Sequence, residues 1–156
     1  MSINLFTQAD KAGRDKVINH INSKYPNRYK MEAKVGKYDR TDIDVTGYTK
    51  NNEVWYTWEC KDRDYPHTAF TGQWVIEDDK IVALRKSSNR KGYYVNTFTD
   101  GYIAIWDISS MTEEEINSLP VKESDWKKTT VIDTGREKKV KKLLPLSKAK
   151  IIEKMS

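Results

Sequence analysis

Two segments, TDIDV at residues 41–45 and VWYTWECKDR at residues 54–63, decide how this chain is expected to fold. The first alternates apolar with polar residues, which is typical of a strand. The second carries apolar and aromatic residues in both of its alternating sets, as expected for a strand in the middle of a covered sheet. Because successive side chains of a strand point to opposite faces, Glu59 and Lys61 should share one face and Cys60 should lie on the other.

Acidic residues from the two strands can converge on the face of Glu59. Asp44 and Glu59 would supply hard oxygen ligands, and one or two carboxylates are enough to hold Mg²⁺ beside a phosphate. The backbone carbonyl of Cys60 offers a further oxygen ligand. The ammonium group of Lys61 would orient an attacking water and offset charge on the phosphate oxygens. The residues therefore predict metal-assisted phosphodiester hydrolysis, and the alternative interpretation is a solvated strand surface around Asp42 and Asp44.

The rest of the chain predicts an alternation of helices and strands. Val17, Ile21 and Tyr25 follow the spacing of one face of a helix and so indicate a helix over residues 7–24, which Pro26 ends. Residues 72–86 fit either a hairpin or a single helix by local pattern. The remaining expected elements are strands at residues 29–33, 40–48, 53–61, 93–98 and 102–108, a capped helix at 112–119 and a late edge strand at 140–146.

Composition favours one domain. The chain has 156 residues, of which 37% are apolar, enough for a single core. We expect this core over about residues 7–108 and a basic C-terminal extension over about 123–156. No apolar run approaches the ~18 residues of a membrane span, and no secretory signal is expected. The only cysteine, Cys60, excludes an internal disulfide and fits a reducing cytoplasm.

Basic residues outnumber acidic ones, 28 to 23, which gives a net charge of +5. This balance permits a polyanionic partner without requiring one. Basic residues gather at 85–91 and 136–142, where the alternatives are contact with nucleic acid and a solvated surface.

The motif in the two opening segments resembles that of the PD-(D/E)xK nuclease superfamily, in particular its small bacterial and phage members. The family pattern is an acidic residue in one strand, a turn, and then an apolar residue followed by Glu-x-Lys; here it reads TDIDV and then WECKDR. The order of elements over about residues 7–108 is also similar. The resemblance implies an α/β fold of the restriction-endonuclease-like type, with a mixed central sheet flanked by helices. It also implies that residues 73–86 form a helix packed on the sheet.

The resemblance further implies a Mg²⁺-dependent deoxyribonuclease, either an endonuclease or an exonuclease, in the cytoplasm of a bacterial or phage-infected cell. Asp44, Glu59 and Lys61 would be the catalytic residues. The metal ligands would be Asp44, Glu59 and the carbonyl of Cys60, with Asp42 as a substitute or second ligand, and Mn²⁺ would substitute for Mg²⁺. The residues expected to contact DNA phosphates are Lys80, Arg85, Lys86, Arg90 and Lys91.

The chain departs from the family pattern in two places. Arg40 and Thr41 stand where a proline usually precedes the first acidic residue, and the first helix offers only Asp10 and Asp15 instead of the glutamate that many members carry. The number of metal ions therefore stays open. DNA is the expected partner, a membrane is not, and a homodimer is allowed. The rival hypothesis is a non-catalytic nucleic-acid-binding or assembly module that retains the nuclease fold.

Overall fold

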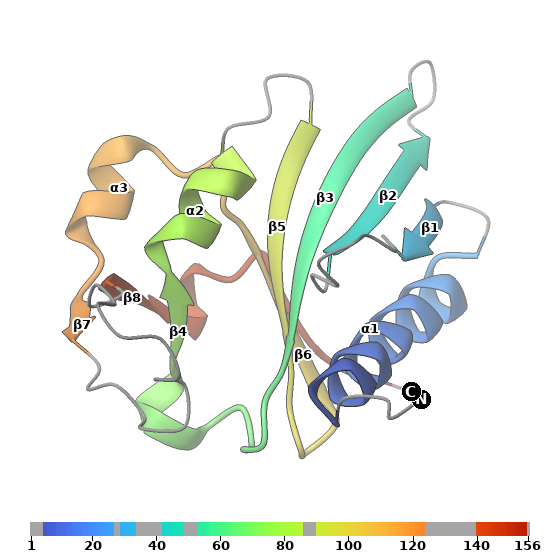
Figure 1. Ribbon diagram of the computed structural model, residues 1–156, viewed down its shortest axis with the longest axis horizontal. Helices are drawn as coiled ribbons and strands as arrows, with labels where there is room; N and C mark the ends of the chain where they lie inside the picture. The colour runs from blue at the N-terminus through green and yellow to red at the C-terminus, as the bar shows by residue number, and fades with distance from the viewer. Residues whose placement is uncertain are drawn as a thin grey trace.

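The computed structural model describes the backbone of residues 5–26, 29–33, 42–48, 53–85, 90–123 and 140–155. It describes the side chains of residues 13–26, 57–85, 91–122 and 140–155. In these parts the chain is a mixed α/β protein with two sheets flanked by helices (Figure 1). None of the helices described there is both long enough and apolar enough to cross a membrane.

The larger sheet has the strand order β1-β2-β3-β5-β6-β9. Its strands are β1 (Tyr29–Ala33), β2 (Asp42–Tyr48), β3 (Glu53–Asp62), β5 (Arg90–Thr97), β6 (Tyr102–Asp107) and β9 (Ile151–Lys154). Strands β3 and β5 are parallel and all other neighbours are antiparallel, so the sheet is mixed, as predicted. The five strands predicted up to residue 108 are all present, and the largest shift is at the start of β5, Arg90 instead of residue 93.

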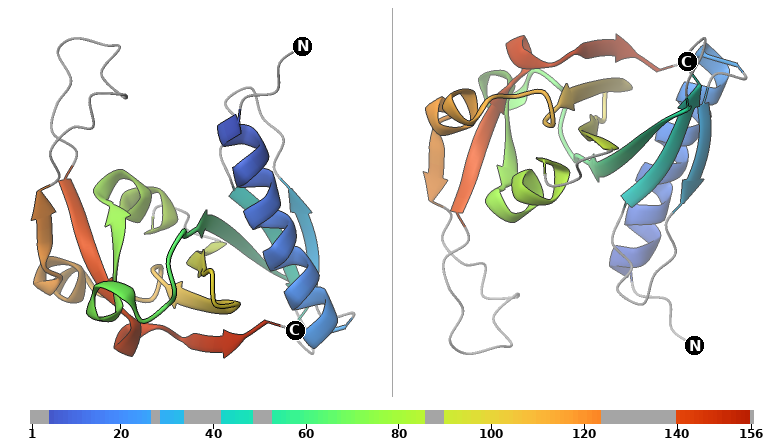
Figure 2. Two further views of the ribbon diagram at one scale, coloured as in Figure 1. Left: turned by 90° about the horizontal axis from the view of Figure 1, so that it is seen from below. Right: turned by 90° about the horizontal axis from the view of Figure 1, so that it is seen from above.

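Helix α1 (Leu5–Lys24) covers one face of this sheet (Figure 2). Val17 and Ile21 are buried in a cluster with Trp58 and Cys60 of β3 and with Val95 of β5. Strand parity therefore works as predicted, since the Cys60 thiol is a core group on the face opposite Glu59. Burial of this apolar stripe holds α1 in place, because apolar area removed from water contributes about 25 cal/mol per Å².

The other face carries α2 (Asp78–Arg85) and a smaller sheet with the order β4-β8-β7. The smaller sheet consists of β4 (Gln73–Glu77), β7 (Val121–Glu123) and β8 (Val140–Pro145). Trp74, Leu84, Tyr94, Trp106 and Leu144 are among the buried residues that join it to the larger sheet. Helix α3 (Glu113–Ser118) begins with the predicted capping box of Thr112 and Glu115.

Residues 73–86 do not form the single helix that was predicted. The first five residues are strand β4, in which Trp74 and Ile76 are buried in alternation, and the helix begins only at Asp78. The hairpin alternative is also wrong, because Ile81 and Leu84 lie in α2. The strand forms because β4 pairs with β8, a segment far along the chain that no local pattern could supply.

The segment that was predicted as a basic C-terminal extension contributes strands to both sheets. Strand β8 was predicted at an edge, but it is the central strand of the smaller sheet, with β4 on one side and β7 on the other. Strand β9 was not predicted, and it pairs with β6 at the edge of the larger sheet. The last third of the chain therefore contributes strands to both sheets.

Strand β5 and helix α2 meet backbone to backbone at Gly92. A Cβ atom at this position would lie 2.1 Å from the carbonyl oxygen of Leu84. We therefore expect Gly92→Ala to lower the free energy of unfolding by about 3 kcal/mol, because backbone must move to relieve the clash. Urea unfolding followed by tryptophan fluorescence measures this loss.

Gly101→Ala is the control, because a Cβ there meets nothing within 4 Å. Its cost should be only about 1 kcal/mol, from the positive φ of 82° that disfavours an L side chain. Equal losses for the two variants would contradict the steric explanation.

Candidate functional site

The acidic residues of β2 lie on the strand next to the Glu-x-Lys motif of β3. In the antiparallel register Asp42 is directly opposite Glu59, and Asp44 is opposite Thr57. Opposite residues lie on one face with Cβ atoms about 4.5–5.5 Å apart, whereas diagonal neighbours are about 7–8 Å apart. Both aspartates are therefore placed on the face of Glu59 and Lys61, and Asp42 is the nearer to Glu59. The side chains of Asp42 and Asp44 lie outside the described residues.

A further acidic residue, Glu32 in β1, was missed by the sequence analysis. The register of β1 and β2 places Glu32 opposite Asp44, so it belongs to the same face as Asp42 and Glu59. In the sequence of β1, the polar residues Lys30 and Glu32 alternate with less polar neighbours, which indicates a strand with one polar face. Only the pairing with β2 shows that this face is also the face of Glu59. The side chain of Glu32 also lies outside the described residues.

Glu59 is nearly buried, with 9% of its surface exposed. The Nζ atom of Lys80 lies 3.2 Å from its Oε1 atom. A buried carboxylate is costly unless it has a charged or hydrogen-bonding partner, so this ion pair offsets part of the cost of burying Glu59. Lys80 reaches Glu59 because α2 starts directly after β4 and lies over the larger sheet. The structure thus brings Lys80 to Glu59, whereas the sequence predicted only that Lys80 contacts DNA.

Glu59 lines a cleft of about 370 Å³ between β3 and the elements on its outer face. The charged lining residues are two carboxylates, Glu59 and Glu77, and five cations, Lys61, Arg63, Lys80, Lys122 and Lys141. The smaller sheet therefore supplies part of the wall. A cleft with this excess of positive charge concentrates anions such as phosphate groups.

Two of these lysines stand directly opposite each other. Lys122 of β7 pairs in register with Lys141 of β8, and Glu77 of β4 is the neighbour of Lys141 on its other side. Like charges directly opposite in a sheet are destabilising. Glu77 offsets part of this cost, but the three side chains still carry a net positive charge, so an anion bound beside the two lysines would be stabilised. Lys141 belongs to the basic run noted in the sequence, whereas Lys122 was missed because its neighbours in β8 are distant in sequence.

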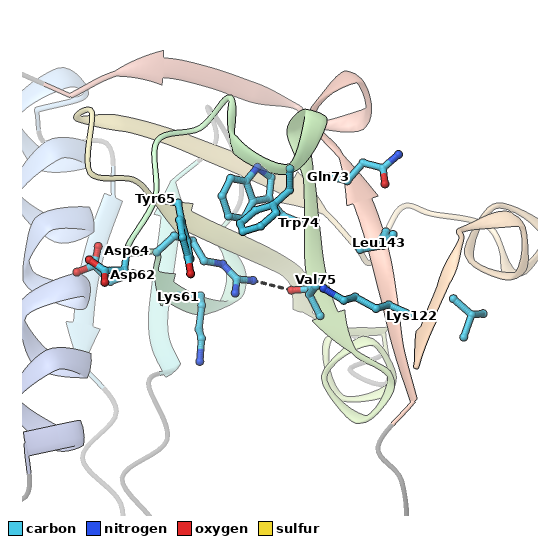
Figure 3. Close-up of a pocket in the computed structure, with 12 residues that line it drawn as sticks. Lys61, Asp62, Asp64, Tyr65, Gln73, Trp74, Val75, Lys122 and Leu143 are labelled. Carbon is cyan, nitrogen blue, oxygen red and sulfur yellow. Dashed lines mark hydrogen bonds between the residues drawn. The ribbon is translucent and has the colours of Figure 1, made fainter. Parts of the chain in front are cut away.

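Arg63 forms the floor of the cleft instead of presenting a free charge. Its Nη2 atom donates to the carbonyl oxygen of Val75 at 2.6 Å, the bond that is dashed in Figure 3. The same atom donates to the hydroxyl of Tyr94 at 3.0 Å, and Nε donates to the Asn96 side chain. The guanidinium also lies 5.6 Å from the centre of the Trp74 ring. Burial raises the pKa of the Tyr94 phenol, against an opposing effect of Arg63, so this hydroxyl stays protonated. Arg63 thus connects the end of β3, which it directly follows, to β4 and β5.

The other predicted DNA contacts lie farther away. Lys91 is on the same face of β5 as Tyr93 and Val95, and these two residues pack in the cluster beneath α1. The structure therefore does not bring Lys91 to the face of Glu59. Arg90 pairs with Trp55, four positions before Glu59. At the usual rise per residue this is about 13 Å along the strand.

Arg85 is exposed in the last turn of α2. Lys86 and the side chain of Arg90 lie outside the described residues. Of the five basic residues predicted to contact DNA, Lys80 is thus the one that the described side chains bring to Glu59.

No group of three or more His, Cys, Asp or Glu side chains suited to a metal is found among those that the structure describes, a set that leaves out Glu32, Asp42 and Asp44. Comparison with protein-family models, with curated proteins and with solved structures found no match for this chain. Fold and cleft together define a mixed α/β protein with a basic cleft around a nearly buried glutamate.

Proposed function

We propose that this protein is a metal-dependent deoxyribonuclease and that the cleft around Glu59 is its active site. The observation that carries the proposal is the register that sets Asp42 opposite Glu59. Glu59 and Lys61 in turn line a cleft rich in cations. The chain order α1-β1-β2-β3-β4-α2-β5 supports a fold of the restriction-endonuclease-like type, because β3 and β5 are parallel neighbours in the larger sheet and only β4, a strand of the smaller sheet, comes between β3 and α2.

The donor set fits a hard divalent cation. The Glu59 carboxylate already forms an ion pair with one cation, the ammonium group of Lys80. Its surroundings therefore stabilise a positive charge next to the carboxylate. Asp42 or Asp44, together with the backbone carbonyl of Cys60, would complete a set of oxygen ligands. When bound, Mg²⁺ or Mn²⁺ would polarise the phosphate and lower the pKa of a coordinated water.

The lysines of the cleft have separate tasks in this proposal. Lys61 is exposed on the face of Glu59, where its ammonium group would orient the attacking water and offset charge on the phosphate oxygens. Lys122 and Lys141 would bind a phosphate of the DNA backbone, since a bound anion relieves the repulsion between them. Arg63 would keep this part of the cleft rigid, because it directly follows β3 and its hydrogen bonds reach β4 and β5.

Incubation of the purified protein with labelled DNA tests the proposal. Single-stranded, double-stranded and branched substrates are offered with Mg²⁺, with Mn²⁺ and with excess EDTA. We expect cleavage of at least one substrate with either metal and none with EDTA. If all three substrates remain intact with both metals, the protein is not a deoxyribonuclease.

The second candidate is a DNA-binding module that has lost turnover. The ion pair between Lys80 and Glu59 favours it, because a permanently bound ammonium group would take the place of a metal. In that case Mn²⁺ would not raise the melting temperature, although DNA would still bind in a salt-dependent way.

Lys80→Met separates these two candidates. If Lys80 and the metal compete for the same carboxylate, the variant should show a larger Mn²⁺-induced rise in melting temperature than the wild type. Lys141→Met is the matched control, because it removes one positive charge from the same cleft but not the contact with Glu59. Equal rises in the two variants would indicate a general charge effect and contradict direct competition.

A further inference from the structure

A second pocket, of about 510 Å³, adjoins the cleft (Figure 3). The two cavities share five lining residues, Lys61, Arg63, Tyr65, Val75 and Lys122. Beyond the shared residues, the second pocket adds aromatic and aliphatic side chains, among them Phe70, Trp74 and Leu143. It also adds the carboxylates Asp62 and Asp64 and the amide of Gln73. A volume of this order is typical of pockets that enclose a small organic group, for which the usual range is about 300–1,000 Å³.

Two aromatic rings at this pocket are unusually exposed. Tyr65 and Phe70 have 50% and 57% of their surface accessible, and their rings meet edge to face with centroids 4.9 Å apart. Phe70 also contacts the edge of Trp74, with centroids 5.7 Å apart. A group of exposed aromatic side chains beside a cleft indicates a binding surface, because a ligand that covers the rings removes their apolar area from water.

The backbone that presents Phe70 is strained. Phe70 and Thr71 have φ values of 54° and 56°, in the left-handed region that residues other than glycine avoid. They lie in the short helical segment Ala69–Gly72, just before β4. Such strain persists where the surrounding structure enforces it, and it gathers at ligand-binding sites. Here the strained turn holds the Phe70 ring at the rim of the pocket.

We infer that this pocket holds one unpaired nucleobase of the DNA substrate, next to the phosphate bound in the cleft. The inference rests on the proposed function and specifies its substrate class, which is DNA with a single-stranded or flipped-out nucleotide. The shared residues Lys61 and Lys122 connect the two cavities, so a ligand with both a phosphate and an aromatic base matches their combined chemistry. The base would stack on Tyr65 or Phe70.

The pocket also offers a polar group for the edge of the base. Gln73 lines it, and its amide carries both a donor and an acceptor. A base within an intact duplex cannot reach such a pocket, because it is stacked and paired. The enzyme should therefore prefer single-stranded or branched DNA over continuous duplex.

DNA binding in EDTA tests this inference without any need for cleavage. We compare the wild type with the double variant Tyr65→Leu/Phe70→Leu, which keeps apolar side chains but removes the rings. Affinity for a single-stranded oligonucleotide should fall about tenfold or more, the usual range for loss of base stacking. Affinity for duplex DNA should stay unchanged. The control is Val82→Ala, which shortens an exposed apolar side chain on α2, away from the pocket. It should change the affinity for neither single-stranded nor duplex DNA.

Oligonucleotides with one abasic position provide a second measurement. Scanning that position along a short single strand should reveal one site where base removal weakens binding to the wild type but not to the double variant. Equal loss in both proteins at every position, or unchanged single-strand binding by the double variant, would overturn the inference.

The outcomes separate the two proposals. If the wild type cuts duplex DNA and the double variant is unaffected in binding and cleavage, the nuclease stands and the base pocket fails. If stacking-dependent binding is found but no substrate is cut with Mg²⁺ or Mn²⁺, the base pocket stands and the nuclease fails. Circular dichroism and the melting temperature establish that the double variant is folded.

Discussion

Glu59→Gln and Lys61→Ala should each reduce DNA cleavage by about a hundredfold to a thousandfold, the usual effect of removing one group that stabilises charge in a transition state. Glu59→Gln removes a negative charge from the proposed metal site but preserves the shape of the side chain. Lys61→Ala removes the ammonium group proposed to orient the water. Because Lys61 is exposed, its loss should change the free energy of unfolding by no more than about 0.5 kcal/mol. Single-turnover cleavage of labelled DNA measures the effect on the chemical step.

Lys154→Ala is the matched control for Lys61→Ala. Lys154 is also an exposed lysine at the end of a strand, but β9 lies at the far edge of the larger sheet from β2. This variant should cleave DNA like the wild type. If Glu59→Gln and Lys61→Ala both remain folded and fully active, the cleft around Glu59 is not the active site.

Asp42→Asn should weaken Mn²⁺ binding by about tenfold or more and should impair cleavage more strongly than Asp44→Asn. The reason is the register, which places Asp42 directly opposite Glu59 and Asp44 one diagonal step farther away. The sequence analysis took Asp44 as the main ligand and Asp42 as its substitute, but the aspartate nearest to Glu59 is decided by strand pairing. Isothermal titration calorimetry with Mn²⁺, performed without DNA, measures the affinity of each variant.

Glu32→Gln completes this comparison. Glu32 is opposite Asp44, so it should act with Asp44 and not with Asp42. We therefore expect Glu32→Gln and Asp44→Asn to have similar and smaller effects on Mn²⁺ affinity. If Asp44→Asn abolishes binding while Asp42→Asn leaves it intact, the main ligand is Asp44 and our reading of the register is wrong.

Local pattern was sufficient for some features because they depend on neighbours in the chain. Alternation in β3 predicted that Cys60 would be buried on the face opposite Glu59, and the cluster with α1 confirms it. The spacing of Val17 and Ile21 predicted the buried stripe of α1, and the Thr112 and Glu115 pair predicted the start of α3. Each of these features arises within one or two turns of helix or within one strand.

The site itself needed the tertiary structure. Residues 73–77 become a strand because β8 offers them hydrogen bonds, although their own sequence fits a helix as well. The same pairing carries Lys141 to the cleft, and the pairing of β7 with β8 sets Lys122 opposite it.

By itself, then, the sequence determined which side chains share a face, because side-chain direction repeats along one strand. Only the tertiary structure decided which strands are neighbours and in what register. Pairing between distant segments depends on the fit of the whole sheet, and a shift of one residue would move every side chain to the other face. For this reason the Glu59 and Lys61 pair was visible in the sequence, whereas its relation to Asp42, Lys80 and Lys122 was not.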